Sequence, residues 1–131
     1  STLLTHGDLL CTDDLPYQAF RTKSHSAKWQ ENVLSKPLIL RLLYARWYRL
    51  RSYFHKRKKS QGIMDVNQQT ITQIMQKYQT RRLIHGHTHR PAVHDLKIQG
   101  QTAQRFVLAE WKIDSASLLS WSESGYKVEP I

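Results

Sequence analysis

The chain opens with a short apolar segment, and apolar residues then recur every three or four positions. Residues 1–5, STLLT, suit a strand that ends at the polar sequence HGD. A helix is expected over residues 15–29, with Asp13 or Asp14 as its N-terminal cap. Pro37 suits the first turn of a second helix, because its ring presets the helical φ. The second helix, to residue 54, carries an apolar stripe of Leu38, Leu42, Leu43, Trp47, Leu50 and Phe54.

A third helix is predicted from residue 65 onward, and strands follow it. Asp65 can cap this helix and Gln68 stands at the capping-box position. Its apolar face holds Ile71, Ile74, Met75 and Tyr78. Residues 81–85 predict a strand, and beyond Pro91 the spacing of two predicts strands over 92–98, 104–111, 116–121 and 126–131. The pattern predicts an α/β chain: strand, helical insert, strand and antiparallel meander.

Positive charge is concentrated in one part of the chain. The net charge is +10, and residues 32–64 contain no Asp or Glu but nine Lys and Arg residues. Such a block usually meets phosphate groups of nucleic acid, lipid or a small substrate. The apolar stripe in this segment could line a chamber for acyl chains or pack against the domain. The single cysteine, Cys11, excludes an internal disulfide and agrees with a reducing compartment.

Histidines gather where the segment LIHGHTHRP, residues 83–91, leaves its strand. His85, His87 and His89 would share one face of a continuous strand, but Gly86 indicates a turn that begins inside the cluster. Three imidazoles in five positions predict a metal site rather than a surface loop. The segment LLTHGD, residues 3–8, repeats this arrangement: an apolar strand is followed by His6, a glycine and a polar side chain. Ligands gather at the carboxyl ends of strands in α/β sheets, so two strands would deliver histidines to one place.

The residue types limit the class of metal. Cys11 stands alone, which argues against a thiolate zinc site. Imidazoles with carboxylates and water suit manganese, iron or zinc in an open catalytic site. Two hydrolytic metals normally share a bridging carboxylate, and Asp8, Asp13 and Asp14 lack an obvious bridging spacing. The chain therefore predicts an incomplete set of ligands.

The motifs HGD and GHTHRP resemble the last two signature blocks of the calcineurin-like metallophosphoesterases. The longer blocks THGDLLCTDDLPYQAFR, GIMDVNQ and LIHGHTHRPAVH are similar to the diphosphatases of lipid A biosynthesis within that family. The resemblance implies a four-layered αββα sandwich with a helical cap insert. Residues 1–14 would form a core strand and loop, residues 15–80 the cap and return helix, and residues 81–131 the core strands with the GHTH metal loop.

The resemblance also implies an activity and a metal set. The reaction is hydrolysis of UDP-2,3-diacylglucosamine at the α-phosphorus, which gives UMP and 2,3-diacylglucosamine 1-phosphate. The enzyme would use two Mn²⁺ ions and act in the cytoplasm, peripheral to the inner membrane. His6 and His87 would bind one metal and His89 the other. His85 belongs to the motif but is not a ligand in the family, so we expect it to support the ligands.

Residues that match the family's substrate positions lie mainly in the expected cap. Asp14, Ser52 and Lys59 match such positions, and His87 would approach the substrate as well as the metal. Lys56 stands where the family more often has an asparagine. No catalytic residue beyond the metal ligands is implied.

Three earlier family blocks are missing: a D-x-H, a G-D that carries the bridging aspartate, and a G-N-R-D. The Gly-Asp pair of this sequence, Gly7-Asp8, belongs to the HGD block. The chain resembles only the C-terminal half of the enzyme. We therefore expect the N-terminal half of the same protein as its partner, with this chain inactive alone.

A second hypothesis is a non-enzymatic, basic amphipathic module. Aromatic residues among arginines in YARWYRLR suit a bilayer interface or base stacking. This hypothesis leaves the histidines unexplained, so it ranks below the enzyme hypothesis. The enzyme hypothesis includes no nucleic-acid partner.

Overall fold

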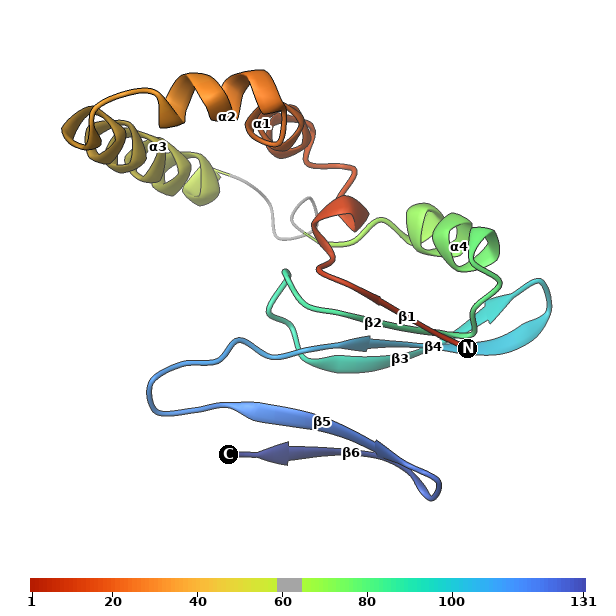
Figure 1. Cartoon of the computed structure of the whole chain (residues 1–131). Helices are drawn as coiled ribbons and strands as arrows, with labels where there is room; N and C mark the ends of the chain where they lie inside the picture. Colours follow the sequence, from red (N-terminus) through yellow and green to blue (C-terminus); the bar gives the residue numbers. More distant parts are fainter. Residues whose placement is uncertain (59–64) are drawn as a thin grey trace. The chain divides into compact units, whose positions relative to one another are not determined.

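The protein divides into two compact units in the computed structural model, which describes residues 1–58 and 65–131 except for the side chains of residues 55–58. One unit, here the sheet unit, joins Ser1–Leu10 to Val66–Ile131, and the other, the helical unit, is Cys11–Asp65. Figure 1 shows the strands in the first and three helices in the second. The predicted mixed α/β class is confirmed, while the four-layered sandwich stays a prediction.

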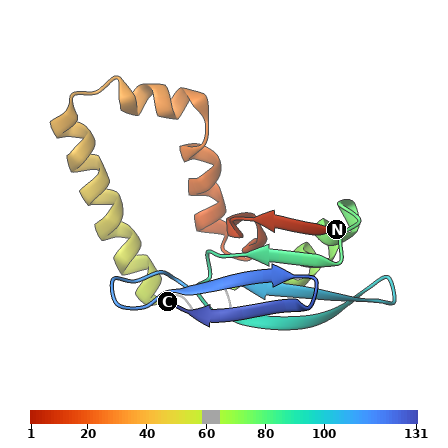
Figure 2. The same cartoon turned by 60° about the horizontal axis from the view of Figure 1, so that its bottom comes forward.

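The sheet unit is built on four strands in the order β1 (Thr2–Thr5), β2 (Arg82–His85), β4 (Gln101–Val107) and β3 (Ala92–Ile98). β2 runs parallel to both β1 and β4, and β3 is antiparallel to β4. Thr5 pairs with His85, so β1 and β2 end side by side. Figure 2 shows β1 at one edge of this sheet. The topology thus brings two strand ends together from distant parts of the sequence.

Each face of this sheet is covered by a different element (Figure 1). Helix α4 (Gln68–Lys77) lies on one face and buries Ile71 and Met75. The hairpin of β5 (Ser117–Ser122) and β6 (Gly125–Pro130) lies on the other. There the ring of the buried Phe106 contacts Trp121 and Tyr126, with centroids 5.4 and 4.8 Å apart. The core of the unit therefore lies on both sides of β4.

The predicted antiparallel meander is confirmed for the pairs β3–β4 and β5–β6 but is wrong between β4 and β5. β4 takes β2 as a parallel neighbour, and β5 pairs with β6 in a separate two-stranded sheet. The β3–β4 turn is a two-residue hairpin in which Gln99 and Gly100 have φ of 52° and 76°. Two positive φ angles in such a loop are the mark of a type I′ turn.

The cap of α4 also differs from the prediction. Asn67 is the N-cap, and its side chain accepts a hydrogen bond from the Thr70 amide at 3.0 Å. Asp65 lies two residues too early to reach that amide, so the predicted Asp65–Gln68 capping box is wrong. On the predicted apolar face, Tyr78 is 54% exposed.

The helical unit contains α1 (Leu15–Ser24), α2 (Ala27–Leu34) and α3 (Leu38–Lys58). Asp14 caps α1 by accepting from the Tyr17 amide at 3.1 Å, which settles the choice between Asp13 and Asp14. The single helix predicted for residues 15–29 is wrong, because it breaks before Ser26. The hydroxyl of Ser26 donates to the Lys23 carbonyl at 2.7 Å, and its extended backbone starts α2 instead.

The apolar stripe of α3 is exposed. Its members have relative exposures between 51 and 61%, so in this chain the stripe does not serve as core. Aromatic packing in this unit centres on Tyr48, whose ring contacts Phe20, Trp29 and Trp47 at centroid distances of 4.9 to 6.5 Å. Within the described residues, no helix is both long enough and apolar enough to span a bilayer.

Candidate metal centre

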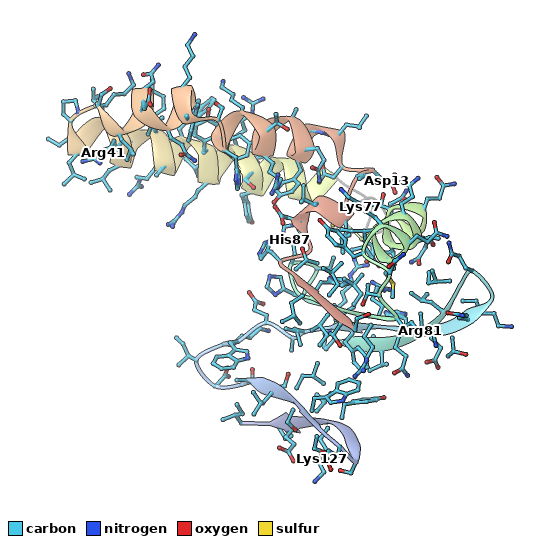
Figure 3. All side chains as sticks on the ribbon, turned by 45° about the vertical axis from the view of Figure 1, so that its right-hand side comes forward. Asp13, Arg41, Lys77, Arg81, His87 and Lys127 are labelled. Carbon is cyan, nitrogen blue, oxygen red and sulfur yellow. The ribbon has the colours of Figure 1, made fainter. Side chains whose placement is uncertain are left out.

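Two of the three histidines predicted as ligands meet where β1 and β2 end. His6 follows β1 directly, and His87 lies two residues beyond β2. Their ring centroids are 5.0 Å apart in an edge-to-face arrangement. Figure 3 labels His87 at this end of the sheet. The carboxyl ends of two parallel strands thus present imidazoles to the same point, as ligand sites in α/β sheets do.

Backbone hydrogen bonds join the two strand ends. The Gly86 amide donates to the His6 carbonyl at 3.1 Å. The chain turns sharply at Gly7, where φ is +105°. A Cβ on Gly7 would lie 2.9 Å from His85 Nδ1 and 3.0 Å from the Gly86 carbonyl oxygen. Only glycine therefore permits both this turn and this close approach.

The histidine loop turns inside the cluster, as predicted. The Thr88 amide donates to the Gly86 carbonyl at 2.8 Å, and His87 between them has φ of +68°. These are the features of the rare γ-turn with positive φ, which is strained. His89 also has a positive φ, +52°. Such strain is found mainly at functional sites, where the surrounding structure holds it in place.

A buried carboxylate orients His6. Asp8 Oδ1 lies 3.0 Å from His6 Nδ1, and the Asp8 side chain is 11% exposed while that of His6 is 69% exposed. This contact leaves Nε2 of His6 available to a metal, in the carboxylate–histidine arrangement common among metal ligands. This role of Asp8 differs from that of a bridging carboxylate, the role for which its spacing is not suited. The His-Gly-Asp spacing was the available signal, because Gly7 lets the chain fold back.

His85 is buried, and protein groups occupy both of its ring nitrogens. Nδ1 lies 2.9 Å from the Gly86 carbonyl oxygen, and Nε2 lies 3.2 Å from Nη1 of Arg105. This geometry leaves His85 no nitrogen for a metal. Arg105, also buried, was not a candidate from sequence, since a single arginine in a strand carries no local signal of function.

His89 is not drawn into the same cluster. In the described parts of the chain, no three His, Cys, Asp or Glu side chains stand close enough together to hold a metal ion. The structure thus brings His6 and His87 together, with Asp8 against His6, but does not complete a ligand set. Imidazole and carboxylate donors suit manganese, iron or zinc, so the identity of the metal stays a prediction.

The predicted substrate residues lie in different parts of the chain. Asp14 is buried at the start of α1, where its carboxylate caps the helix. Ser52 is exposed on α3. Lys56 belongs to α3, but its side chain is outside the described residues, and Lys59 lies outside them altogether.

Removal of the Asp8 carboxylate should weaken metal binding. We expect Asp8→Ala to lower the Mn²⁺ affinity of the chain by about 10–100-fold, because His6 loses the group that sets its orientation. Electron paramagnetic resonance of free Mn²⁺ measures this affinity. Asp13→Ala, which removes an exposed carboxylate at a position with no proposed metal role, is the control. Equal affinities for both variants would remove Asp8 from the site.

Comparison with known proteins finds similar curated relatives, although no family model matches the chain. UDP-2,3-diacylglucosamine hydrolase of Salmonella typhi is 50% identical over 111 residues, which cover 85% of this chain and 46% of that protein. The protein of the same name from Escherichia coli O81 is 48% identical over 114 residues, 87% of this chain and 48% of the relative. The one from Serratia proteamaculans is 45% identical over 116 residues, 88% of this chain and 48% of the relative.

The chain therefore spans about half the length of the curated relatives that it matches. The matched stretches cover 85 to 88% of this chain. The resemblance noted in the sequence is confirmed, and the chain is a homologue of the UDP-2,3-diacylglucosamine hydrolases.

Proposed function

We propose that this chain is the part of a UDP-2,3-diacylglucosamine hydrolase that supplies the histidines of its metal centre. The whole protein would hydrolyse its substrate at the α-phosphorus, giving UMP and 2,3-diacylglucosamine 1-phosphate in lipid A biosynthesis. The observation that carries the proposal is the meeting of His6 and His87 at the ends of β1 and β2, with Asp8 behind His6. Relatives of this name at 45–50% identity support it.

Two Mn²⁺ ions are the proposed cofactors. His6 and His87 would hold one ion and His89 the other, an assignment supported by the contact between the first two rings. When bound, the ions would supply positive charge beside the phosphoryl oxygens and a more acidic water. Asp8 would keep Nε2 of His6 directed outward, and the strained turn at His87 would hold the second imidazole beside it.

The remaining part of the protein would complete the site. The relatives are about twice as long as the stretch that they share with this chain. We propose that the unmatched part supplies the carboxylates, including the bridging one, and pairs with this chain. The edge strand β1 offers unpaired backbone groups to such a partner.

Substrate contacts are proposed for Asp14, Ser52, Lys56, Lys59 and His87. Lys59 would act as a point charge on the diphosphate and Ser52 as a hydrogen-bond donor. His87 would contact both metal and substrate. The buried, helix-capping Asp14 would act in part through the start of α1, which it holds.

A chimera tests the proposed function. In it, this chain replaces the matched stretch of the Salmonella typhi relative, at 50% identity. We expect Mn²⁺-dependent release of UMP from UDP-2,3-diacylglucosamine by the chimera. The 131-residue chain alone should release none, because its described residues do not complete a metal-ligand set. A folded chimera without activity, or an active isolated chain, would contradict the proposal.

The non-enzymatic alternative is not favoured, since the matched relatives are named hydrolases. The basic helix still has a place in the enzyme proposal, because the substrate is a lipid. We propose that α3 contacts the cytoplasmic face of the inner membrane. Its exposed apolar residues and arginines are the support for this.

Vesicle binding by the chain should therefore depend on salt. Binding to vesicles with anionic headgroups should weaken as salt rises, because the arginines of α3 are screened. Trp47→Ala should weaken binding, since Trp47 is 51% exposed on α3. Trp111→Ala is the control, as Trp111 is 67% exposed but lies outside α3. Co-sedimentation measures both effects. Binding that ignores salt would indicate insertion of the apolar stripe instead.

A further inference from the structure

A buried pair, His85 and Arg105, lies behind the metal loop. His85 is 1% exposed and Arg105 is 3% exposed. Leu83 pairs with Arg105, and His85 with Val107, so His85 and Arg105 lie on the same face of adjacent strands. Burial of a guanidinium is costly unless hydrogen bonds compensate it. The buried guanidinium of Arg105 contacts His85, which precedes His87 by two residues.

The contacts of His85 require one particular tautomer. Nη1 of Arg105 lies 3.2 Å from His85 Nε2. A guanidinium can only donate, so Nε2 must accept and the hydrogen of the neutral ring must be on Nδ1. Nδ1 in turn lies 2.9 Å from the Gly86 carbonyl oxygen, which can only accept. The two contacts therefore agree on the Nδ1–H form.

The Gly86 carbonyl connects this pair to the ligand loop. The same oxygen accepts from the Thr88 amide at 2.8 Å and so closes the turn in which His87 has φ of +68°. On the other side of the same residue, the Gly86 amide donates to the His6 carbonyl. A hydrogen bond from His85 thus fixes the Gly86 carbonyl that closes the strained turn, and the amide of the same residue faces His6.

We infer that Arg105 is a positioning residue: it holds His85 in the Nδ1–H tautomer and thereby fixes the Gly86 carbonyl and the turn that directs His87 toward His6. The last step rests on the proposed function, since it takes His87 as a ligand. The steps from Arg105 to the turn do not. A lysine could donate a hydrogen bond to His85 but lacks the planar guanidinium, so Arg105→Lys should hold the His85 tautomer and the turn only in part.

Nitrogen-15 spectra of the histidine side chains test the first steps, in the metal-free 131-residue chain. At about pH 8, where an ordinary histidine is neutral, His85 should show a hydrogen on Nδ1 only. Arg105→Met should give a mixture of tautomers, and Arg105→Lys should retain mainly the wild-type form. The control is Arg82→Met, because Arg82 lies 4.5 Å over the Trp121 ring and does not contact His85. An Nε2–H tautomer in the wild type would overturn the inference even if Arg105→Met fails to fold.

The turn itself provides the second measurement. A strong intraresidue amide–Hα Overhauser effect at His87 reports its positive φ, and Arg105→Met should lose it. His85→Asn can still donate to the Gly86 carbonyl and should retain it, whereas His85→Leu should not. Mn²⁺ affinity should fall by about 10–100-fold in Arg105→Met, as for other groups behind metal ligands.

The outcomes separate this inference from the proposed function. A wild-type tautomer and turn in Arg105→Met would overturn the positioning role. If the turn is lost in Arg105→Met while Mn²⁺ affinity stays at the wild-type value, then His87 as a ligand, and not the positioning of the loop, is contradicted. An inactive chimera with the expected tautomer would count against the proposed function alone.

Discussion

Replacement of His87 by alanine in the chimera should lower the rate of UMP release by about a thousandfold or more. The variant loses a proposed metal ligand and a proposed substrate contact together. Loss of the charge that one metal supplies to the phosphoryl oxygens is worth several kcal/mol, and about 4 kcal/mol corresponds to a thousandfold. Initial rates at saturating Mn²⁺ measure the effect, and circular dichroism checks the fold.

Two further histidines serve as comparisons for this experiment. His85→Ala should lose less, because His85 supports the loop but has no nitrogen left for a metal. His25→Ala should leave the rate nearly unchanged, as His25 lies exposed at the end of α1. Equal losses at His85 and His87 would show that the ligand assignment is wrong.

The strand ends could be predicted from sequence because their signals are local. Apolar residues that lead into His6 and His85, each followed by glycine, specify two strands with the same kind of ending. The parallel pairing of β1 with β2 then brings His6 and His87 together. The shared motif was enough to predict this meeting, because the carboxyl ends of neighbouring parallel strands lie at the same edge of a sheet.

Strand partners could not be predicted in the same way. Alternation of apolar residues predicts strands over residues 92–98 and 104–111 but does not say what lies beside them. The first prediction is confirmed by β3, whereas the strand in the second region is β4, Gln101–Val107, which begins and ends earlier than predicted. Phe106 pairs with Ile84 of the parallel strand β2 and with no residue of β5. Its side chain contacts the rings of Trp121 and Tyr126, which pack on the face of the sheet. A parallel neighbour separated by a long stretch of chain leaves no mark on local spacing.

The supporting groups of the site were missed for a related reason. Arg105 and His85 are 20 residues apart, and nothing near Arg105 in the sequence distinguishes it from an exposed strand arginine. Burial against β2 gives it a role, and burial depends on the tertiary fold. The N-cap of α4 was predicted wrongly for a similar reason. Asp and Asn are both favourable N-cap residues, so the sequence alone does not distinguish Asp65 from Asn67, and the residue at which α4 begins determines which of them caps it.

Gly7→Ala should destabilise the sheet unit by about 3 kcal/mol. Roughly 1–2 kcal/mol comes from the positive φ of +105°, which an L side chain adopts at a cost. The rest comes from the added Cβ, which would stand 2.9 Å from His85 Nδ1 and 3.0 Å from the Gly86 carbonyl oxygen. Hydrogen exchange of the β2 and β4 amides measures the stability of this unit separately from the helical one.

Gly125→Ala separates the two contributions. Gly125 has a similar φ of +123°, but a Cβ there meets nothing within 4 Å. We expect it to cost only the backbone term, about 1–2 kcal/mol. The additional loss at Gly7 then measures how closely the strand ends approach each other. Mn²⁺ affinity should fall in Gly7→Ala and not in Gly125→Ala, because only the former displaces the His85–Gly86 contact. If both variants lose the same stability, Gly7 is required for the turn alone and the two strand ends have room to move apart.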